Sequence, residues 1–122
     1  MRVRLTQDHR APEREPLVLR RGDLVQARQR DDPEALAAIE QWPAFVWVLA
    51  GDRGGWVPSR FLDVDADGSG VALRDYDTTE LSAGADDVLE VVEDDTESGW
   101  VWVRAADGRE GWVPWNSVEP LA

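Results

Sequence analysis

The chain contains no cysteine, and it has only one histidine, one tyrosine and one methionine among its 122 residues. Without cysteine, neither a disulfide nor a thiolate zinc site can stabilise the fold. A single histidine, His9, argues against an all-histidine metal site and against a histidine-based catalytic triad. No apolar run reaches the length of a signal peptide or a membrane span, so we expect a cytoplasmic protein with no membrane partner.

Lysine is also absent, and all thirteen basic residues are arginine, which we interpret as the codon usage of a GC-rich bacterial genome. The net charge is −12, and it is unevenly spread along the sequence. Residues 1–62 carry ten Arg against nine Asp and Glu, whereas residues 71–122 carry three against thirteen. Such an acidic field repels nucleic acid and attracts cationic partners. Ordinary solubility charge is the alternative explanation.

One tetrapeptide occurs twice: Gly55-Trp56-Val57-Pro58 returns 56 residues later as Gly111-Trp112-Val113-Pro114. This period predicts two copies of one small fold, each within the range of about 55–65 residues that can fold alone. We therefore expect a first domain at 1–62, an acidic linker at 63–70 and a second domain at 71–122. The linker resembles the start of a calcium loop, but Arg74 stands where a bidentate Glu is needed, so a plain Asp-Gly turn is favoured.

The second repeat reads as strands and turns. Residues 87–92 and 99–104 are rich in β-formers, and Ala106-Asp107-Gly108 is typical of a tight hairpin. Alternation along 99–104 places Val101 and Val103 on an inner face and the indoles of Trp100 and Trp102 on the outer one.

The first repeat has a similar pattern, interrupted by an insertion at 31–43. Asp32 is a candidate N-cap, which predicts a short helix at 33–42. Leu36, Ile39 and Trp42 would form its apolar stripe, and the helix needs that stripe to pack against the barrel.

Ala72-Leu73-Arg74-Asp75-Tyr76 resembles the Ala-Leu-Tyr-Asp-Tyr opening of an SH3 domain, and Gly108 to Val118 resembles its distal hairpin and closing motif. The first repeat is similar through 5–9, 22–23, 45–48 and 52–62. The resemblance implies an all-β fold of two tandem SH3-like five-stranded barrels. It also implies a groove that binds Pro-rich peptides in the polyproline II conformation, with acidic residues that select a basic side chain.

Carried over by position, the resemblance implies a set of peptide-binding residues. In the second repeat they are Tyr76, Trp100, Pro114 and Asn116 in the groove, Trp102 and Trp115 nearby, and Asp94, Asp95 and Glu97 in the acidic loop. In the first repeat they are Phe45, Pro58 and Phe61. Arg74 and Ser117 replace two family tyrosines, which argues against a plain Pro-x-x-Pro ligand. In the first repeat, His9 falls where the second tyrosine of the opening motif belongs, and we interpret it as a surface substitution.

These patterns favour a non-catalytic adaptor without a cofactor or metal. It would bind a basic, Pro-containing peptide at the second domain or at a surface shared by both domains, as a monomer or weak homodimer. The alternative is an acidic, immunity-type inhibitor that neutralises a basic folded protein by charge complementarity. No catalytic spacing of carboxylates is recognisable, so we do not expect an enzyme.

Overall fold

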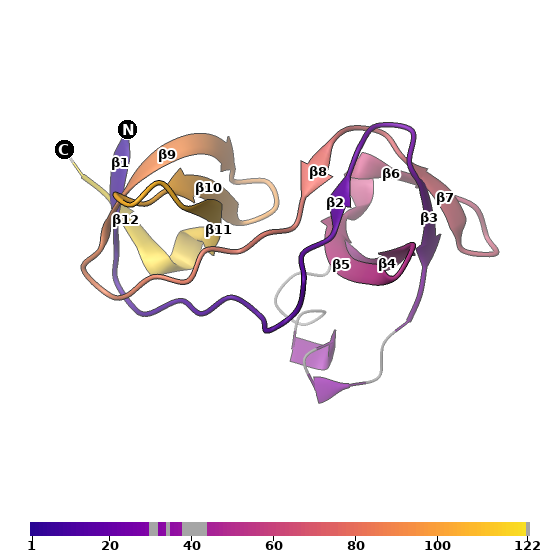
Figure 1. Cartoon of the computed structure of the whole chain (residues 1–122), viewed down its shortest axis with the longest axis horizontal. Coiled ribbons are helices and arrows are strands. Elements are labelled where there is room, and N and C mark those ends of the chain that lie inside the picture. Colours follow the sequence, from indigo (N-terminus) through magenta and orange to yellow (C-terminus); the bar gives the residue numbers. More distant parts are fainter. Residues whose placement is uncertain (30–31, 34, 38–43, 122) are drawn as a thin grey trace. The chain divides into compact units, whose positions relative to one another are not determined.

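A computed structural model describes residues 1–29, 32–33, 35–37 and 44–121, most of which lie in strands or in the turns that join them (Figure 1). The strands in chain order are β1 (Arg2–Leu5), β2 (Val18–Leu19), β3 (Leu24–Ala27), β4 (Phe45–Ala50), β5 (Arg53–Pro58), β6 (Leu62–Val64), β7 (Ser69–Ala72), β8 (Tyr76–Asp77), β9 (Val88–Asp95), β10 (Trp100–Arg104), β11 (Glu110–Pro114) and β12 (Val118–Pro120). Two 3-10 turns, η1 (Ser59–Phe61) and η2 (Trp115–Ser117), follow β5 and β11. The predicted all-β fold is confirmed.

The chain forms two compact units, and one of them is discontinuous in sequence. Unit 1 combines Met1–Arg14 with Thr79–Ala122, and unit 2 is Glu15–Thr78. In Figure 1 the indigo strand β1 accordingly lies among the orange and yellow strands β9 to β12. This division differs from the predicted boundaries at 1–62, 63–70 and 71–122, because the first strand of the chain pairs with strands of the second repeat.

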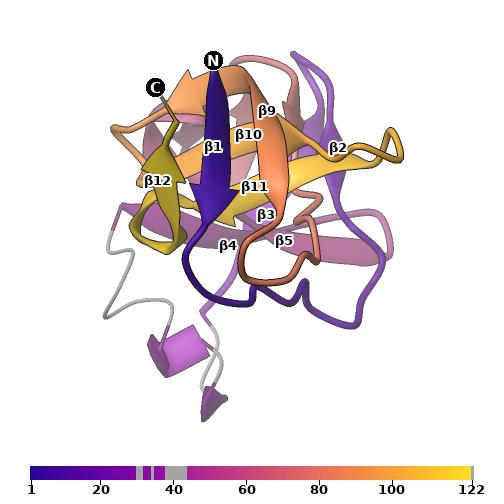
Figure 2. The same ribbon diagram turned by 90° about the vertical axis from the view of Figure 1, so that its left-hand side faces the viewer.

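The sheet of unit 1 has the strand order β11-β10-β9-β1-β12. Strand β1 pairs antiparallel with both neighbours, so that Val3 lies opposite Leu89 on one side and Pro120 on the other (Figure 2). Val3 and Leu5 are 0% exposed and pack with Leu81, Leu89, Val101, Val103 and Val113. Alternation along β1 and β10 therefore builds the core, and β1 is an interior strand rather than an edge.

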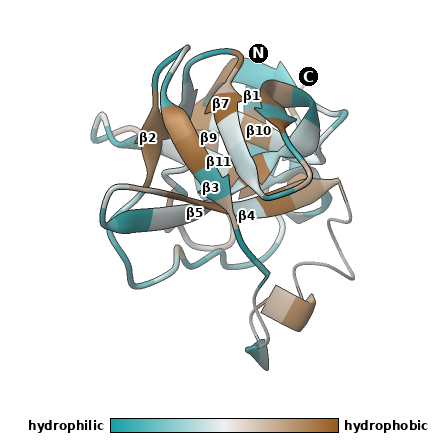
Figure 3. Cartoon of the chain, turned by 90° about the vertical axis from the view of Figure 1, so that its right-hand side faces the viewer, coloured by the Kyte–Doolittle hydropathy of each residue, from teal (hydrophilic) through white to brown (hydrophobic). Residues whose placement is uncertain are grey.

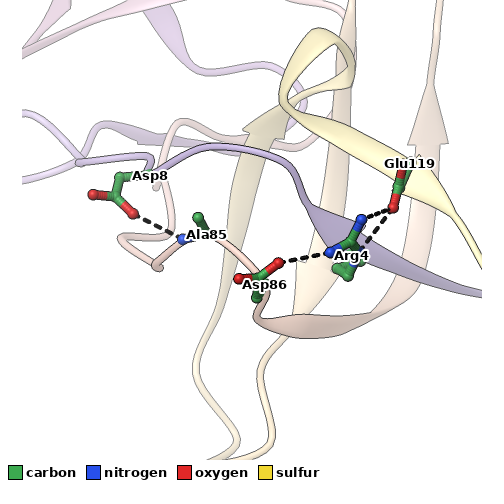
Figure 4. A network of polar contacts seen from close by, with 5 residues as sticks. All are labelled: Arg4, Asp8, Ala85, Asp86 and Glu119. Carbon is green, nitrogen blue, oxygen red and sulfur yellow. Dashed lines mark hydrogen bonds and ion pairs between the residues drawn. The ribbon is translucent and has the colours of Figure 1, made fainter.

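The opposite face of β1 carries a polar network (Figure 4). The Nε of Arg4 donates to the Oε1 of Glu119 in β12 at 2.8 Å, and its Nη1 donates to the Oδ1 of Asp86 at 2.6 Å. The backbone N–H of Ala85 donates to the Oδ1 of Asp8 at 2.8 Å. These contacts tie the N-terminal segment to β12 and to the turn before β9.

Unit 2 repeats this arrangement with its own strands. Its sheet has the order β5-β4-β3-β7-β6, and β2 and β8 form a separate antiparallel pair. Strand β7 lies between β3 and β6, as β1 lies between β9 and β12. The opening strand of each sequence repeat is thus placed in the sheet built by the other repeat.

The predicted linker at 63–70 is part of this sheet. Residues of β6 and β7 pair across a tight turn in which the N–H of Asp65 donates to the carbonyl of Ser69 at 2.8 Å. Gly68 adopts a φ of +90°, a left-handed conformation that favours glycine. The turn was expected, but it closes a hairpin within unit 2 instead of linking two domains.

The insertion in unit 2 begins with a capped helical turn. Residues 33 and 35–37 are helical, and the Oδ1 of Asp32 accepts a hydrogen bond from the N–H of Ala35 at 2.7 Å. The predicted N-cap is confirmed. Leu36 is 55% exposed, and most of the helix predicted at 33–42, including Ile39 and Trp42, lies outside the described residues.

The division into units also changes where the charge lies. Unit 1 contains six Arg and thirteen Asp and Glu, and unit 2 contains seven and twelve. Both units are therefore acidic, and the contrast between the sequence halves is not a contrast between the units. Hydrophobic residues gather on the strands while the connecting loops are largely hydrophilic (Figure 3). Within the described ranges, no helix is long and apolar enough to cross a membrane.

Candidate peptide-binding surfaces

Four of the predicted site residues come together at the start of β10. Trp100 lies opposite Pro114 of β11, and η2 then places Trp115 and Asn116 directly after that proline. The N–H of Trp115 donates to the carbonyl of Gly99 at 2.9 Å, which holds η2 beside the start of β10. Trp100 is partly exposed and Asn116 exposed, whereas Trp115 packs against the core of unit 1.

The predicted acidic residues lie at the end of β9 and in the turn that leads to Trp100. Asp95 lies opposite Trp100 across the β9–β10 ladder, and Asp94 lies opposite Val101. Glu97 stands in the turn that follows, where the N–H of Gly99 donates to the carbonyl of Thr96 at 3.0 Å. Asp94 and Glu97 are exposed and Asp95 is half-buried. Directly paired residues point to the same face of a sheet, so Asp95 shares the face of the partly exposed indole. Asp94 is paired with the buried Val101 instead, and its Oδ1 accepts a hydrogen bond from the N–H of Thr96 at 3.1 Å.

His9 contacts Trp100 from the N-terminal segment, although the sequence interpretation gave it no role. The two rings meet edge to face, with their centroids 5.9 Å apart and an interplanar angle of 72°. The Nδ1 of His9 is 2.7 Å from the carbonyl oxygen of Leu81, and its Nε2 is 3.2 Å from the Oε1 of Glu80. Burial lowers the pKa of His9, but the hydrogen bonds with Glu80 and Leu81 outweigh burial and hold that pKa above its usual value.

Tyr76 and Trp100, which the predicted groove brought together, belong to different units. Tyr76 belongs to unit 2, is 7% exposed and packs on the ring of Phe61 with their centroids 5.5 Å apart. Phe45 lies opposite Pro58 in the same unit. The reason is the placement of the opening strands: β7 brings Tyr76 to the first-repeat residues, and β1 brings His9 to the second-repeat residues.

The aromatic surface of unit 2 carries two cations. The guanidinium carbons of Arg60 and Arg74 lie over the ring of Phe61, at 4.2 Å and 4.5 Å from its centroid. Such contacts are cation–π interactions, and they occupy ring surface that a proline would otherwise use. The surfaces of the two units therefore differ in charge close to their aromatic residues.

Trp102 shares the outer face of β10 with Trp100 but is engaged within the protein. Its Nε1–H donates to the Oε1 of Glu110 at 2.8 Å, and its ring packs edge-on against Trp112, 5.2 Å between centroids. Hydrogen bonds from Trp102 and Arg104 lower the pKa of Glu110. Unit 2 contains a similar pair, Trp47 and Trp56, at 5.3 Å. We conclude that these cross-strand pairs pack the sheets.

Among the residues that the structure describes, no group of three or more His, Asp or Glu side chains could hold a metal ion. In the comparisons with known proteins, the family model of the variant SH3 domain matches residues 70–121. No curated protein and no solved structure matches the chain. The matched segment starts with β7 and β8 in unit 2 and ends with β12 in unit 1. The chain therefore carries an SH3-like segment. SH3 domains are typically non-catalytic modules of protein–protein interaction.

Proposed function

We propose that the chain is a non-catalytic adaptor that binds an extended, Pro-containing, basic peptide at the Trp100 surface. This surface consists of Trp100, Asn116, His9 and the acidic residues Asp94, Asp95 and Glu97, and the buried Pro114 pairs with Trp100 from β11. The observation that supports it best is the position of Trp100, a partly exposed indole with Pro114 opposite on one strand and Asp95 opposite on the other.

The chemistry of the Trp100 surface suits such a ligand. A flat indole offers a stacking face to a proline ring, and a polyproline II segment loses little entropy on binding because it is already ordered. An Arg of the ligand can pair with the carboxylates of Asp94 and Glu97, which are exposed at the end of β9 and in the turn before Trp100. The thirteen acidic residues of unit 1 add long-range attraction for a basic segment.

The aromatic surface of unit 2 is less suited to a basic peptide. Arg60 and Arg74 lie over Phe61, so a cationic ligand would approach two positive groups there. Tyr76, which a groove would use as a wall, is buried beside the same ring. The proposal therefore assigns peptide binding to unit 1.

An NMR titration of the seven Trp indole signals with Arg-containing, Pro-rich peptides tests this proposal. We expect a saturable shift of the Trp100 signal, with Trp47 and Trp56 of unit 2 as internal controls. Trp100→Ala should weaken binding by at least about tenfold, the loss expected for a central aromatic contact. Trp56→Phe is the matched control and should leave the affinity unchanged. No shift of Trp100 at millimolar peptide would contradict the proposal.

The acidic loop is tested separately by the double variant Asp94→Asn with Glu97→Gln. We expect weaker binding of Arg-containing peptides and a smaller dependence of affinity on salt, because exposed charges act through screened attraction. A basic folded protein that binds equally well to the Trp100→Ala variant, but not to this double variant, would favour the alternative of a charge-neutralising inhibitor.

A further inference from the structure

The backbone holds His9 in one place beside Trp100. His9 and Ala83 form an isolated antiparallel bridge, in which each N–H donates to the other's carbonyl at 2.9 Å. The side chain of His9 is 12% exposed and that of Glu80 is 21% exposed. The backbone of His9 is thus fixed by two main-chain hydrogen bonds, and its imidazole is largely removed from water and lies against the indole.

Both ring nitrogens of His9 face oxygen atoms. The carbonyl oxygen of Leu81 can only accept, so Nδ1 must carry a proton to use the 2.7 Å contact. The Oε1 of Glu80, 3.2 Å from Nε2, is likewise an acceptor when Glu80 is ionised. Only the doubly protonated ring donates to both oxygens. A neutral ring would keep one donor and turn a lone pair toward a carboxylate.

We infer that His9 is a positioning residue of the Trp100 surface, held by Glu80 as an imidazolium, and that loss of its second proton weakens peptide binding there. This inference rests on the proposed function. The charged imidazolium is attracted to the carboxylate of Glu80, which holds the imidazole in place against the indole of Trp100. After the proton is lost, the Nε2 contact with Glu80 becomes repulsive, and Trp100 loses a neighbour that limits its movement.

Other charged groups lie on the elements around His9, and several are engaged elsewhere. Asp8 accepts a hydrogen bond from the N–H of Ala85, and the Nη1 of Arg109 donates to the carbonyl of Ser82. The remaining charged residues on the neighbouring segments are Arg10 next to His9, Asp86 and Asp87 before β9, and Asp95 opposite Trp100. Glu80 is the carboxylate whose ion-pair contact with the His9 ring is given by the structure.

Because His9 is the only histidine of the chain, its titration can be followed without ambiguity in the untagged protein. We would record the His9 Cε1–H signal, the Trp100 indole signal and the peptide affinity across pH 5 to 9. The Trp100 signal should move with the midpoint of the His9 titration, and the affinity should fall about threefold to tenfold as the pH rises through that midpoint. A tenfold loss of affinity corresponds to a difference of about one unit between the pKa of His9 in the peptide complex and in the free protein.

Two variants separate positioning from a general effect of pH. Glu80→Gln keeps an acceptor but removes the charge, and it should lower the pKa of His9 and move the affinity profile to lower pH. His9→Tyr supplies a ring that does not titrate in this range, and its affinity should not vary with pH. Glu13→Gln, an exposed carboxylate in the same N-terminal segment, is the control and should behave as the wild type.

The outcomes distinguish this inference from the proposed function. If the Trp100 signal ignores the His9 titration, or if His9→Tyr keeps the wild-type pH profile, the inference is overturned while peptide binding stands. If no peptide binds at any pH, the proposed function fails and the effect on affinity fails with it. The pH titration of the protein without peptide would still show whether the Trp100 signal follows the protonation of His9.

Discussion

Gly111 lies directly against the backbone of Glu80. A Cβ placed on Gly111 would be 2.8 Å from the carbonyl carbon of Glu80 and 2.7 Å from the amide nitrogen of Leu81. The same segment is held there by hydrogen bonds from the N–H of Trp112 to Thr79 and from the N–H of Leu81 to Trp112. Gly55 is its counterpart in unit 2, where a Cβ would be 3.1 Å from side-chain atoms of Leu17 and Thr78. The glycine that starts each repeated tetrapeptide therefore leaves room for a crossing segment, that is, a stretch of chain that passes close to the strand at this residue.

Gly111→Ala should destabilise unit 1 by about 1–3 kcal/mol, because the new methyl group overlaps backbone atoms that cannot move independently. Gly55→Ala should cost less, since its new methyl group would approach neighbouring atoms only to 3.1 Å. Urea denaturation of both variants measures the difference. Equal losses, or a larger loss for Gly55→Ala, would contradict this account of the crossing segment.

Leu5→Ala should destabilise unit 1 even though Leu5 lies in the first repeat. Leu5 is 0% exposed, and truncating a buried leucine typically costs about 2–5 kcal/mol. Hydrogen exchange should show faster exchange at the amides of β9, β10 and β12. Val92→Ala is the control, because Val92 is 47% exposed and its loss should change little. Faster exchange confined to β3 and β4 would mean that β1 belongs to the other sheet.

Much of the fold could be predicted from the sequence because it depends on local patterns. Alternation along 99–104 correctly predicted that Val101 and Val103 are buried, at 0% exposure. The turn predicted at Ala106-Asp107-Gly108 is also present, with Gly108 at a φ of +90°. Each of these features depends on neighbouring residues, which the sequence displays directly.

The pairing of the opening strands could not be predicted in the same way. Residues 2–5 and 69–72 are short strands of four residues, and either could occupy the position between the second and last strands of a sheet. Local propensity is the same for both arrangements, so long-range packing decides between them. This is why Tyr76 and His9 were assigned to the wrong neighbours, and why the one signal for His9, its place at a family tyrosine, was not interpreted as a site.

Fragments offer a direct test of this strand placement. Residues 79–122 lack β1 and should not form the sheet of unit 1 alone, because β1 pairs with both β9 and β12. A peptide of residues 1–14 should restore strand signals in circular dichroism and a dispersed Trp100 indole signal. The same peptide with Val3→Asp and Leu5→Asp is the control and should fail. The predicted contiguous domain, residues 71–122, should be measured in parallel. If either fragment folds without the peptide, β1 is dispensable, and folding of residues 71–122 would support the contiguous boundaries.

Glu110 should make the stability of unit 1 depend on pH in the acidic range. Its pKa is lowered by hydrogen bonds from Trp102 and Arg104, so its ionised form is favoured in the folded state. A carboxyl group with a lowered folded-state pKa stabilises the protein above the unfolded value of 4.5, and this stabilisation is lost as the pH falls through the folded value.

Glu110→Gln should therefore reduce the difference between urea midpoints measured at pH 6 and pH 3, and Trp102→Phe should act in the same direction. Glu13→Gln is the matched control, since Glu13 is exposed. A Glu110→Gln variant that loses as much stability in acid as the wild type would show that the Trp102–Glu110 hydrogen bond does not stabilise the folded state.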